Sequence, residues 1–257
     1  MTNILLLLFF LRVAAANVRP EVNRELLDFI RHCDLYIPIS QTFMSFLPRG
    51  IRVDFVEGRV TVDGGQVAPG VVPRILHCLH LIPGTLGVAH VQIGMLSITG
   101  EMALYEMEFL HLHEATLHTI ELVGCVFDKS ALEVLSFARL EALRSLSITR
   151  SSLDGAALAA LLSTATSLLS TLDISESIYV SWKGAAIANA VRRFSALQEF
   201  ACRECGLNEN AKELIAALVH LDTLRSVDLN DNQVAQILTA QLQNREVGWT
   251  LLRIFDN

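Results

Sequence analysis

The 257-residue chain is poor in charge and carries none of the short motifs that mark common enzyme classes. Charged residues make up only 18% of it, and the formal net charge is −7. That balance argues against a nucleic-acid partner, because phosphate binding needs a basic surface. No P-loop, nucleophile elbow or glycine-rich phosphate loop occurs. These absences favour a binding protein without cofactor or catalytic activity over an enzyme.

Cysteine is also scarce, and its number is odd. The five cysteines are Cys33, Cys78, Cys125, Cys202 and Cys205. So sparse a set does not form the disulfide framework of a small secreted domain. Cys202 and Cys205 form a CxxC motif, but no second CxxC exists to complete a zinc site. The chain has no N-x-S/T sequon, so a secreted form would carry no N-linked glycan.

Long apolar runs are missing except at the N-terminus. Residues 4–11 are consecutive apolar side chains, and Ala14 to Ala16 follow as a small-residue cleavage motif. This order is typical of a secretory signal peptide over residues 1–16, and the run is too short to span a bilayer. No Lys or Arg precedes the run, so the alternative is a buried first strand or helix of the N-terminal cap, and the alternative location is the cytoplasm. We predict secretion, without a stable membrane span.

What the chain does contain is an apolar pattern that returns about every 24–28 residues. It reads L-x-x-L-x-L-x-x-[C/S/N]-x-Φ, where Φ is apolar, and its positions are numbered 1 to 11 below. Position 1 falls at Leu117, Leu143, Leu169, Leu197, Leu224 and Leu251. A weaker copy is placed with Ile93 at position 1 and Glu101 at position 9. Such a period is typical of stacked units rather than of one globular core.

Each copy predicts a short strand, a turn and a helix. Positions 4 and 6 are two residues apart and therefore point to the same side of a strand. Position 9 favours a small side chain that hydrogen-bonds the turning backbone. After position 11 the apolar spacing becomes helical, as at Leu158, Leu161 and Leu162. Cys202 and Cys205 fall on positions 6 and 9, so we interpret this CxxC as buried core rather than as a metal or redox site.

This pattern resembles that of leucine-rich repeat proteins of the helix-bearing kind. The long helical segments resemble the ribonuclease-inhibitor-like subclass, and Cys125 and Cys205 at position 9 resemble the cysteine-containing subclass. The resemblance covers residues 93–257. It implies a right-handed α/β solenoid of about six or seven repeats, with parallel strands on the concave side and helices on the convex side. The family binds very different partners, so the resemblance implies protein binding without naming the partner.

Residues 17–92 do not follow the pattern. Residues 22–33 read as an amphipathic helix, residues 51–56 and 59–63 as a hairpin, and residues 71–81 as a second helix. We expect this region to be an N-terminal cap that covers the first repeat, because solenoid ends need covering. The alternative is a separate recognition module.

The strand positions that do not face the core, 3, 5, 7 and 8, predict a binding surface of aligned columns. Its middle is rich in Ser and Thr, whereas its C-terminal half carries acids. Neighbouring like charges are unfavourable unless a basic partner uses them. The alternative is an ordinary solvated face that arginines partly neutralise. The candidate partner-binding residues are Glu121, Ser147, Arg150, Asp173, Glu176, Arg203, Glu204, Asp228 and Asp231.

Two other functional interpretations stay open. The cysteine-containing subclass resembles the substrate-reading part of F-box proteins, although residues 21–48 offer only a poor F-box. A cytosolic inhibitor or GTPase regulator is also consistent with helical repeats. His111, His113 and His118 cluster beside Glu114, and we interpret this cluster as solvated surface rather than as a metal site. The sequence does not indicate an oligomeric state.

Overall fold

The computed structural model describes an α/β protein built on a nine-stranded, mostly parallel sheet. The residues it describes are 50–54, 59–67, 90–94, 97–98, 110, 114–128, 130–131, 135–137, 140–177, 184–242 and 250–253. Within them, no helix combines the length and the apolar character needed to cross a bilayer. The expected signal peptide and both helices predicted between residues 22 and 81 lie outside these ranges.

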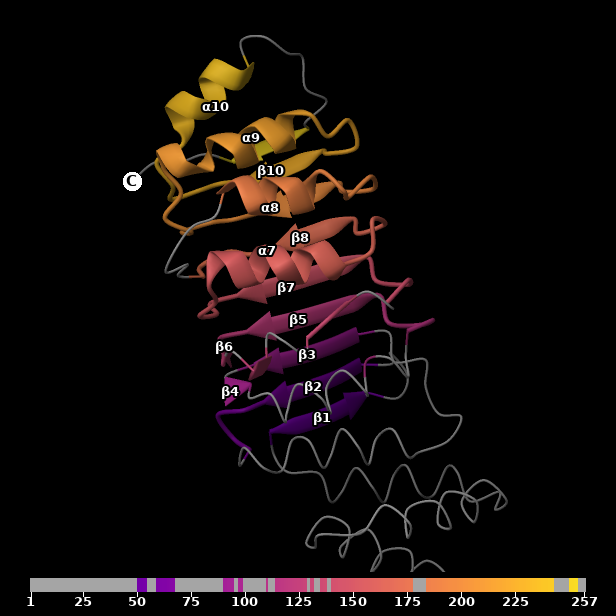
Figure 1. The fold of residues 1–257 in the computed structure, drawn as a ribbon. Helices are drawn as coiled ribbons and strands as arrows, with labels where there is room; N and C mark the ends of the chain where they lie inside the picture. The colour runs from indigo at the N-terminus through magenta and orange to yellow at the C-terminus, as the bar shows by residue number, and fades with distance from the viewer. Residues whose placement is uncertain are drawn as a thin grey trace, which may run out of the picture.

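The strands of the main sheet follow one another in chain order (Figure 1). β1 (Ile51–Asp54) and β2 (Arg59–Asp63) are antiparallel, which confirms the predicted hairpin. Every later neighbour is parallel. These strands are β3 (His90–Gly94), β5 (Thr119–Val123), β7 (Ser145–Thr149), β8 (Thr171–Asp173), β9 (Glu199–Ala201), β10 (Ser226–Asp228) and β11 (Leu251–Arg253). A second, two-stranded sheet pairs β4 (Ser97–Ile98) with β6 (Val126–Phe127).

Helices line one side of this sheet (Figure 1). They are α7 (Gly155–Thr164), α8 (Gly184–Val191), the 3-10 turn η1 (Glu209–Ala211), α9 (Lys212–Val219) and α10 (Ala235–Leu242). Side-chain caps start two of these elements. Asp154 accepts a hydrogen bond from Ala156 N at the start of α7, and Asn208 accepts one from Asn210 N at η1. Successive helices contact one another along the stack.

The core lies between the sheet and these helices. β3, β5 and β7 share one burial pattern, in which alternate side chains are buried and the others are half-buried. The buried side chains occupy positions 4 and 6, as the period of two requires. At position 4 they are Ile120, Leu146, Leu172, Phe200 and Val227, none more than 1% exposed. Burial of one such side chain contributes about 1.5–3 kcal/mol.

A ladder of position-9 side chains holds the strand ends together beside this core. Each lies within hydrogen-bond distance of the position-6 carbonyl of the preceding copy; Ser177 Oγ donates to Ile148 O at 3.1 Å and Asn232 Nδ2 donates to Cys202 O at 2.6 Å. Most also accept from a backbone N–H of that copy. The members of the ladder are Cys125, Ser151, Ser177, Cys205 and Asn232. The predicted role of position 9 is therefore confirmed.

The predicted frame is wrong for the first and the last copy. Val91 and Ile93 pair with Ile120 and Leu122, so Ile93 occupies position 6 rather than position 1. Leu251 pairs with Ser226, so it occupies position 3, and Arg253 stands at position 5 beside Asp228. In both copies another apolar residue satisfies the pattern equally well, and the hydrogen-bonded register decides between the two frames.

The sheet also continues upstream of residue 93. β1 and β2 fall in the segment expected to be a cap, yet β2 is parallel to β3 and belongs to the same sheet. Val60 and Val62 of β2 are 1% exposed and pair with Val91 and Ile93. The strand face therefore extends over β1, β2 and β3 as well as over the later strands.

Candidate functional site

The candidate site is the face of the main sheet opposite the helices. Along position 5, the register places Glu121, Ser147, Asp173, Ala201, Asp228 and Arg253 side by side on successive strands. Asp228 is buried at 9% exposed and Arg253 is exposed, whereas the other side chains of the column are half-buried. Adjacent parallel strands lie about 4.8 Å apart, so neighbours in a column are in contact range.

Position 8, just beyond the end of each strand, has a left-handed backbone in every copy described. Gly124 has φ 64°, and four non-glycine residues share the conformation: Arg150, Glu176, Glu204 and Asp231, with φ of 54°, 56°, 49° and 59°. Left-handed backbone is unfavourable for side chains other than glycine, least so for Asn and Asp. The sequence at this turn therefore keeps charged side chains where glycine would fit better.

The turn is held in place from both sides. The position-8 N–H donates to the position-7 carbonyl of the next copy, as Arg150 N does to Ser175 O and Glu204 N does to Asn230 O. The position-9 ladder follows directly. These hydrogen bonds to the neighbouring copies fix the backbone of the turn. They also align the charged side chains of position 8 along one edge of the face.

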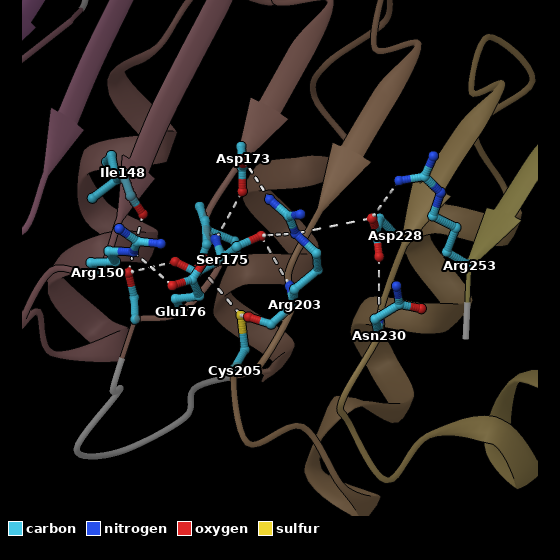
Figure 2. A network of polar contacts seen from close by, with 12 residues as sticks. Ile148, Arg150, Asp173, Ser175, Glu176, Arg203, Cys205, Asp228, Asn230 and Arg253 are labelled. Carbon is cyan, nitrogen blue, oxygen red and sulfur yellow. Dashed lines mark hydrogen bonds and ion pairs between the residues drawn. The ribbon is translucent and has the colours of Figure 1, made fainter. Parts of the chain in front are cut away.

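Arg150 and Glu176 form the shortest ion pair of this edge, with Nε 2.7 Å from Oε2 (Figure 2). The hydrogen bond from the Arg150 guanidinium, together with its charge, holds the pKa of the Glu176 carboxyl below its usual range. The same hydrogen bond raises the pKa of Arg150. The Arg150 side chain is 65% exposed and the Glu176 side chain 33% exposed, so water and salt screen the pair.

Arg203, at position 7, lies between two acids of the position-5 column. Its guanidinium is 3.8 Å from Asp173 Oδ2 through Nη2 and 4.0 Å from Asp228 Oδ2 through Nε (Figure 2). Arg253 Nη1 approaches Asp228 from the other side at 3.6 Å. Acid and base thus alternate along this part of the face, and the acids of position 5 are largely neutralised within the chain.

Asp173 and Asp228 also serve the backbone. Asp173 Oδ1 accepts from Ser175 N at 2.9 Å, and Asp228 Oδ1 accepts from Asn230 N at 3.3 Å. Two copies thus use the same side chain to satisfy the same N–H as the strand ends. These two aspartates therefore help to hold the strand ends whether or not the face contacts a partner.

The structure places the nine predicted residues on one continuous face and its edge. Sequence reasoning missed three others. Ser175 is fully buried and accepts from Arg203 N at 3.0 Å. His90 Nε2 lies 3.2 Å from Glu121 Oε1. Arg253 stands at position 5 beside Asp228, whereas the predicted frame, with Leu251 at position 1, puts it at position 3. A frame with Val91 at position 4 and Ile93 at position 6 would have placed His90 on the strand face. A frame with Leu252 at position 4 would have placed Arg253 there as well.

No metal site is found among the described residues, where no group of three or more His, Cys, Asp and Glu side chains is arranged to hold an ion. His118 and Glu114 are exposed. His111 and His113 lie outside the described ranges, so the prediction of a solvated histidine cluster stays untested.

The CxxC is buried, as predicted, but its two sulfurs are also bonded to each other. Cys202 is 0% exposed and Cys205 is 7% exposed, and they form a disulfide. Sequence reasoning expected only core packing here. Cys125, the position-9 cysteine of an earlier copy, is a buried free thiol.

In comparisons with known proteins, no protein-family model and no curated protein sequence matches this chain significantly.

Proposed function

We propose that this chain is a secreted leucine-rich repeat protein that binds a protein partner on its strand face and has no catalytic activity. A parallel sheet with its strands in chain order and helices along one side supports the solenoid on which this proposal rests. The pattern and the position-9 ladder, repeated from Cys125 to Asn232, support it further.

One observation carries the binding role: the position-8 edge presents charged side chains on a backbone that favours glycine. Strained conformations of this kind persist where the surroundings impose them, and they concentrate at functional sites. The edge is acidic beyond the Arg150–Glu176 pair, with Glu204 exposed and Asp231 half-exposed. Among the described residues Glu204 makes no ion pair. A partner with a basic patch would neutralise this edge.

The rest of the face suits a polar, shallow contact. Positions 3 and 7 present Thr119, Ser145, Thr149 and Thr171 as half-buried hydroxyls between the strands. Rigid hydroxyl side chains lose little entropy on binding, and they accept or donate hydrogen bonds as the partner requires. The acidic edge then orients the partner and raises the association rate more than it raises the affinity.

Secretion is the second part of the proposal. The signal-like residues 1–16 and the Cys202–Cys205 disulfide both support it, because disulfides persist in oxidising compartments. N-terminal sequencing of protein secreted from a eukaryotic host tests this part. A mature chain that begins at Asn17 is expected, and an intact Met1 on protein retained in the cytoplasm contradicts it.

The binding role is tested with a face variant that keeps the backbone: Glu176→Gln, Glu204→Asn and Asp231→Asn together. These replacements remove the three charges; Gln keeps the length of the Glu176 side chain, and Asn tolerates the left-handed conformation. A matched control, Glu209→Gln with Glu213→Gln, removes exposed acids from η1 and α9 instead. Each protein serves as bait in extracellular extract, and bound proteins are quantified by mass spectrometry. The affinity of the main captured protein is then measured at two salt concentrations.

The wild type and the helix-side control are expected to bind the same basic protein. The face variant is expected to bind about tenfold more weakly, because three rim charges contribute about 0.2–1 kcal/mol each. Its affinity should also depend less on salt. Equal affinity and equal salt dependence for all three proteins would exclude the acidic edge from binding.

A further inference from the structure

We propose that Cys202 and Cys205 form a reversible redox pair that sets the rigidity of the strand face at Arg203. The inference does not depend on which partner the face binds. It rests on a conflict between two structural roles of one sulfur atom, Cys205 Sγ.

The first role is in the ladder. Cys205 Sγ lies 3.3 Å from Ile174 O and 3.4 Å from Arg203 O. The free thiol of Cys125 makes the same two contacts in its own copy, 3.5 Å from Ile93 O and 3.8 Å from Val123 O. The hydroxyls of the position-9 serines occupy this place in the two copies between them. The site is therefore built for a hydrogen-bond donor, and a thiol at Cys205 meets that need.

The second role is the disulfide. Bonded to Cys202, the Cys205 sulfur carries no hydrogen and donates to neither carbonyl. Oxidation thus exchanges a ladder hydrogen bond for a covalent link. No other described position-9 side chain has a cysteine at position 6 of its own copy to bond with. Position 6 of the other copies holds Leu122, Ile148, Ile174 or Leu229.

The two residues enclosed by the link belong to the candidate site. Arg203 N donates to Ser175 Oγ, and its guanidinium lies between Asp173 and Asp228. Glu204 has the left-handed backbone of position 8. A link across this turn restricts its opening, and breaking the link leaves only the hydrogen bond to Ser175 and the ion pairs with Asp173 and Asp228 to hold Arg203 in place (Figure 2). The redox state is therefore transmitted to the face without any longer-range change.

The reaction is thiol–disulfide exchange with a small-molecule disulfide, for which glutathione disulfide serves as oxidant. The Cys205 thiolate, the more exposed of the two, attacks one sulfur; that S–S bond breaks, and one small thiolate leaves. The Cys202 thiolate then attacks the Cys205 sulfur, the intramolecular S–S bond forms, and the second small thiolate leaves. Two electrons pass from the protein to the oxidant, and the two protons released end on the departing thiols. Reduced glutathione reverses both steps.

The sequence supplies a direct assay. Trypsin cleaves after Arg203, between the two cysteines, and gives peptides 194–203 and 204–212. Full-length native protein is equilibrated in glutathione disulfide or in reduced glutathione, alkylated, denatured and digested. The oxidised form is expected to yield the two peptides joined, and the reduced form the two peptides alkylated separately. Amide hydrogen exchange of the same native samples reports the rigidity of residues 203–205.

Exchange at residues 203–205 is expected to be on the order of tenfold slower in the oxidised protein, because the link limits local opening. Cys205→Ser should fold, since serine fills position 9 twice in this chain, and its exchange should be the same in both buffers. Cys202→Ala, which keeps the Cys205 thiol, should behave likewise. Separate peptides in both buffers, joined peptides in both buffers, or joined peptides without a change in exchange would each overturn the proposal.

Discussion

Replacing Glu204 with glycine tests whether the position-8 edge is strained. Glu204 is exposed, has φ 49°, and makes no ion pair among the described residues. Its backbone N–H to Asn230 O bond is kept by glycine. The left-handed conformation costs a side-chain-bearing residue about 1–2 kcal/mol, whereas glycine adds unfolded-state entropy worth about 0.4–1 kcal/mol. We therefore expect Glu204→Gly to stabilise the protein by about 0.5–1 kcal/mol.

The measurement is urea unfolding at neutral pH in an oxidising buffer, so that the adjacent disulfide is equal in both proteins. In a parallel thermal unfolding experiment, a gain of 1 kcal/mol should raise the midpoint temperature by about 2–4 °C in a domain of this size. Glu199→Gly in β9 is the matched control, because it makes the same replacement five residues away in extended backbone. It should destabilise by about 0.5–1 kcal/mol. If both variants lose stability equally, the position-8 backbone is not strained and the functional argument built on it fails.

Three further predictions concern the ladder and the Arg150–Glu176 pair. Asn232→Ala should lower the free energy of unfolding by about 2–4 kcal/mol, because it leaves buried backbone groups without partners. Asn189→Ala, at an exposed position of α8, should cost under about 0.5 kcal/mol, and equal losses in urea unfolding would contradict the ladder. Cys125→Ser should change the free energy of unfolding by less than about 1 kcal/mol, whereas Cys125→Val should lower it by about 1–3 kcal/mol, since only serine keeps the hydrogen-bond donor. Calorimetric unfolding of the two variants measures this difference. The lowered pKa of Glu176 contributes stability above its unfolded-state pKa, and this stability is lost as pH falls through the folded-state pKa. The difference in stability between wild type and Arg150→Gln should therefore vanish in acid. Carboxyl NMR titration should show the pKa of Glu176 rising in that variant, and an unchanged pKa would refute the pairing.

The repeated pattern predicted much of this architecture because one set of physical demands recurs in each copy. Inward-facing positions 4 and 6 follow from the period of two, and the residue that closes each strand must hydrogen-bond a turning backbone. Ile120 and Leu146 are buried, and Ser151 and Asn232 donate in the ladder, as the frame requires. A parallel arrangement of such units also brings the outward-facing side chains into columns.

The frame was wrong where two apolar residues compete for the same position. Ile93 can serve as position 1 or 6, and at the other end Leu251 and Leu252 are equally apolar. Hydrophobicity alone does not separate such alternatives, because a shifted frame still places an apolar residue at position 4. Backbone hydrogen bonds with β5 and β10 separate them. Correcting the frame brings His90 and Arg253 onto the face.

By itself, then, the sequence determined which side chains are buried, which face is polar, and that small donors close each strand, since these follow from local periodicity. Only the tertiary structure decided which charges touch, because that depends on the register between copies roughly 26 residues apart. Register places Arg203 between Asp173 and Asp228. Packing of neighbouring copies likewise imposes left-handed backbone on Glu176 and Glu204, residues whose own preferences do not favour it.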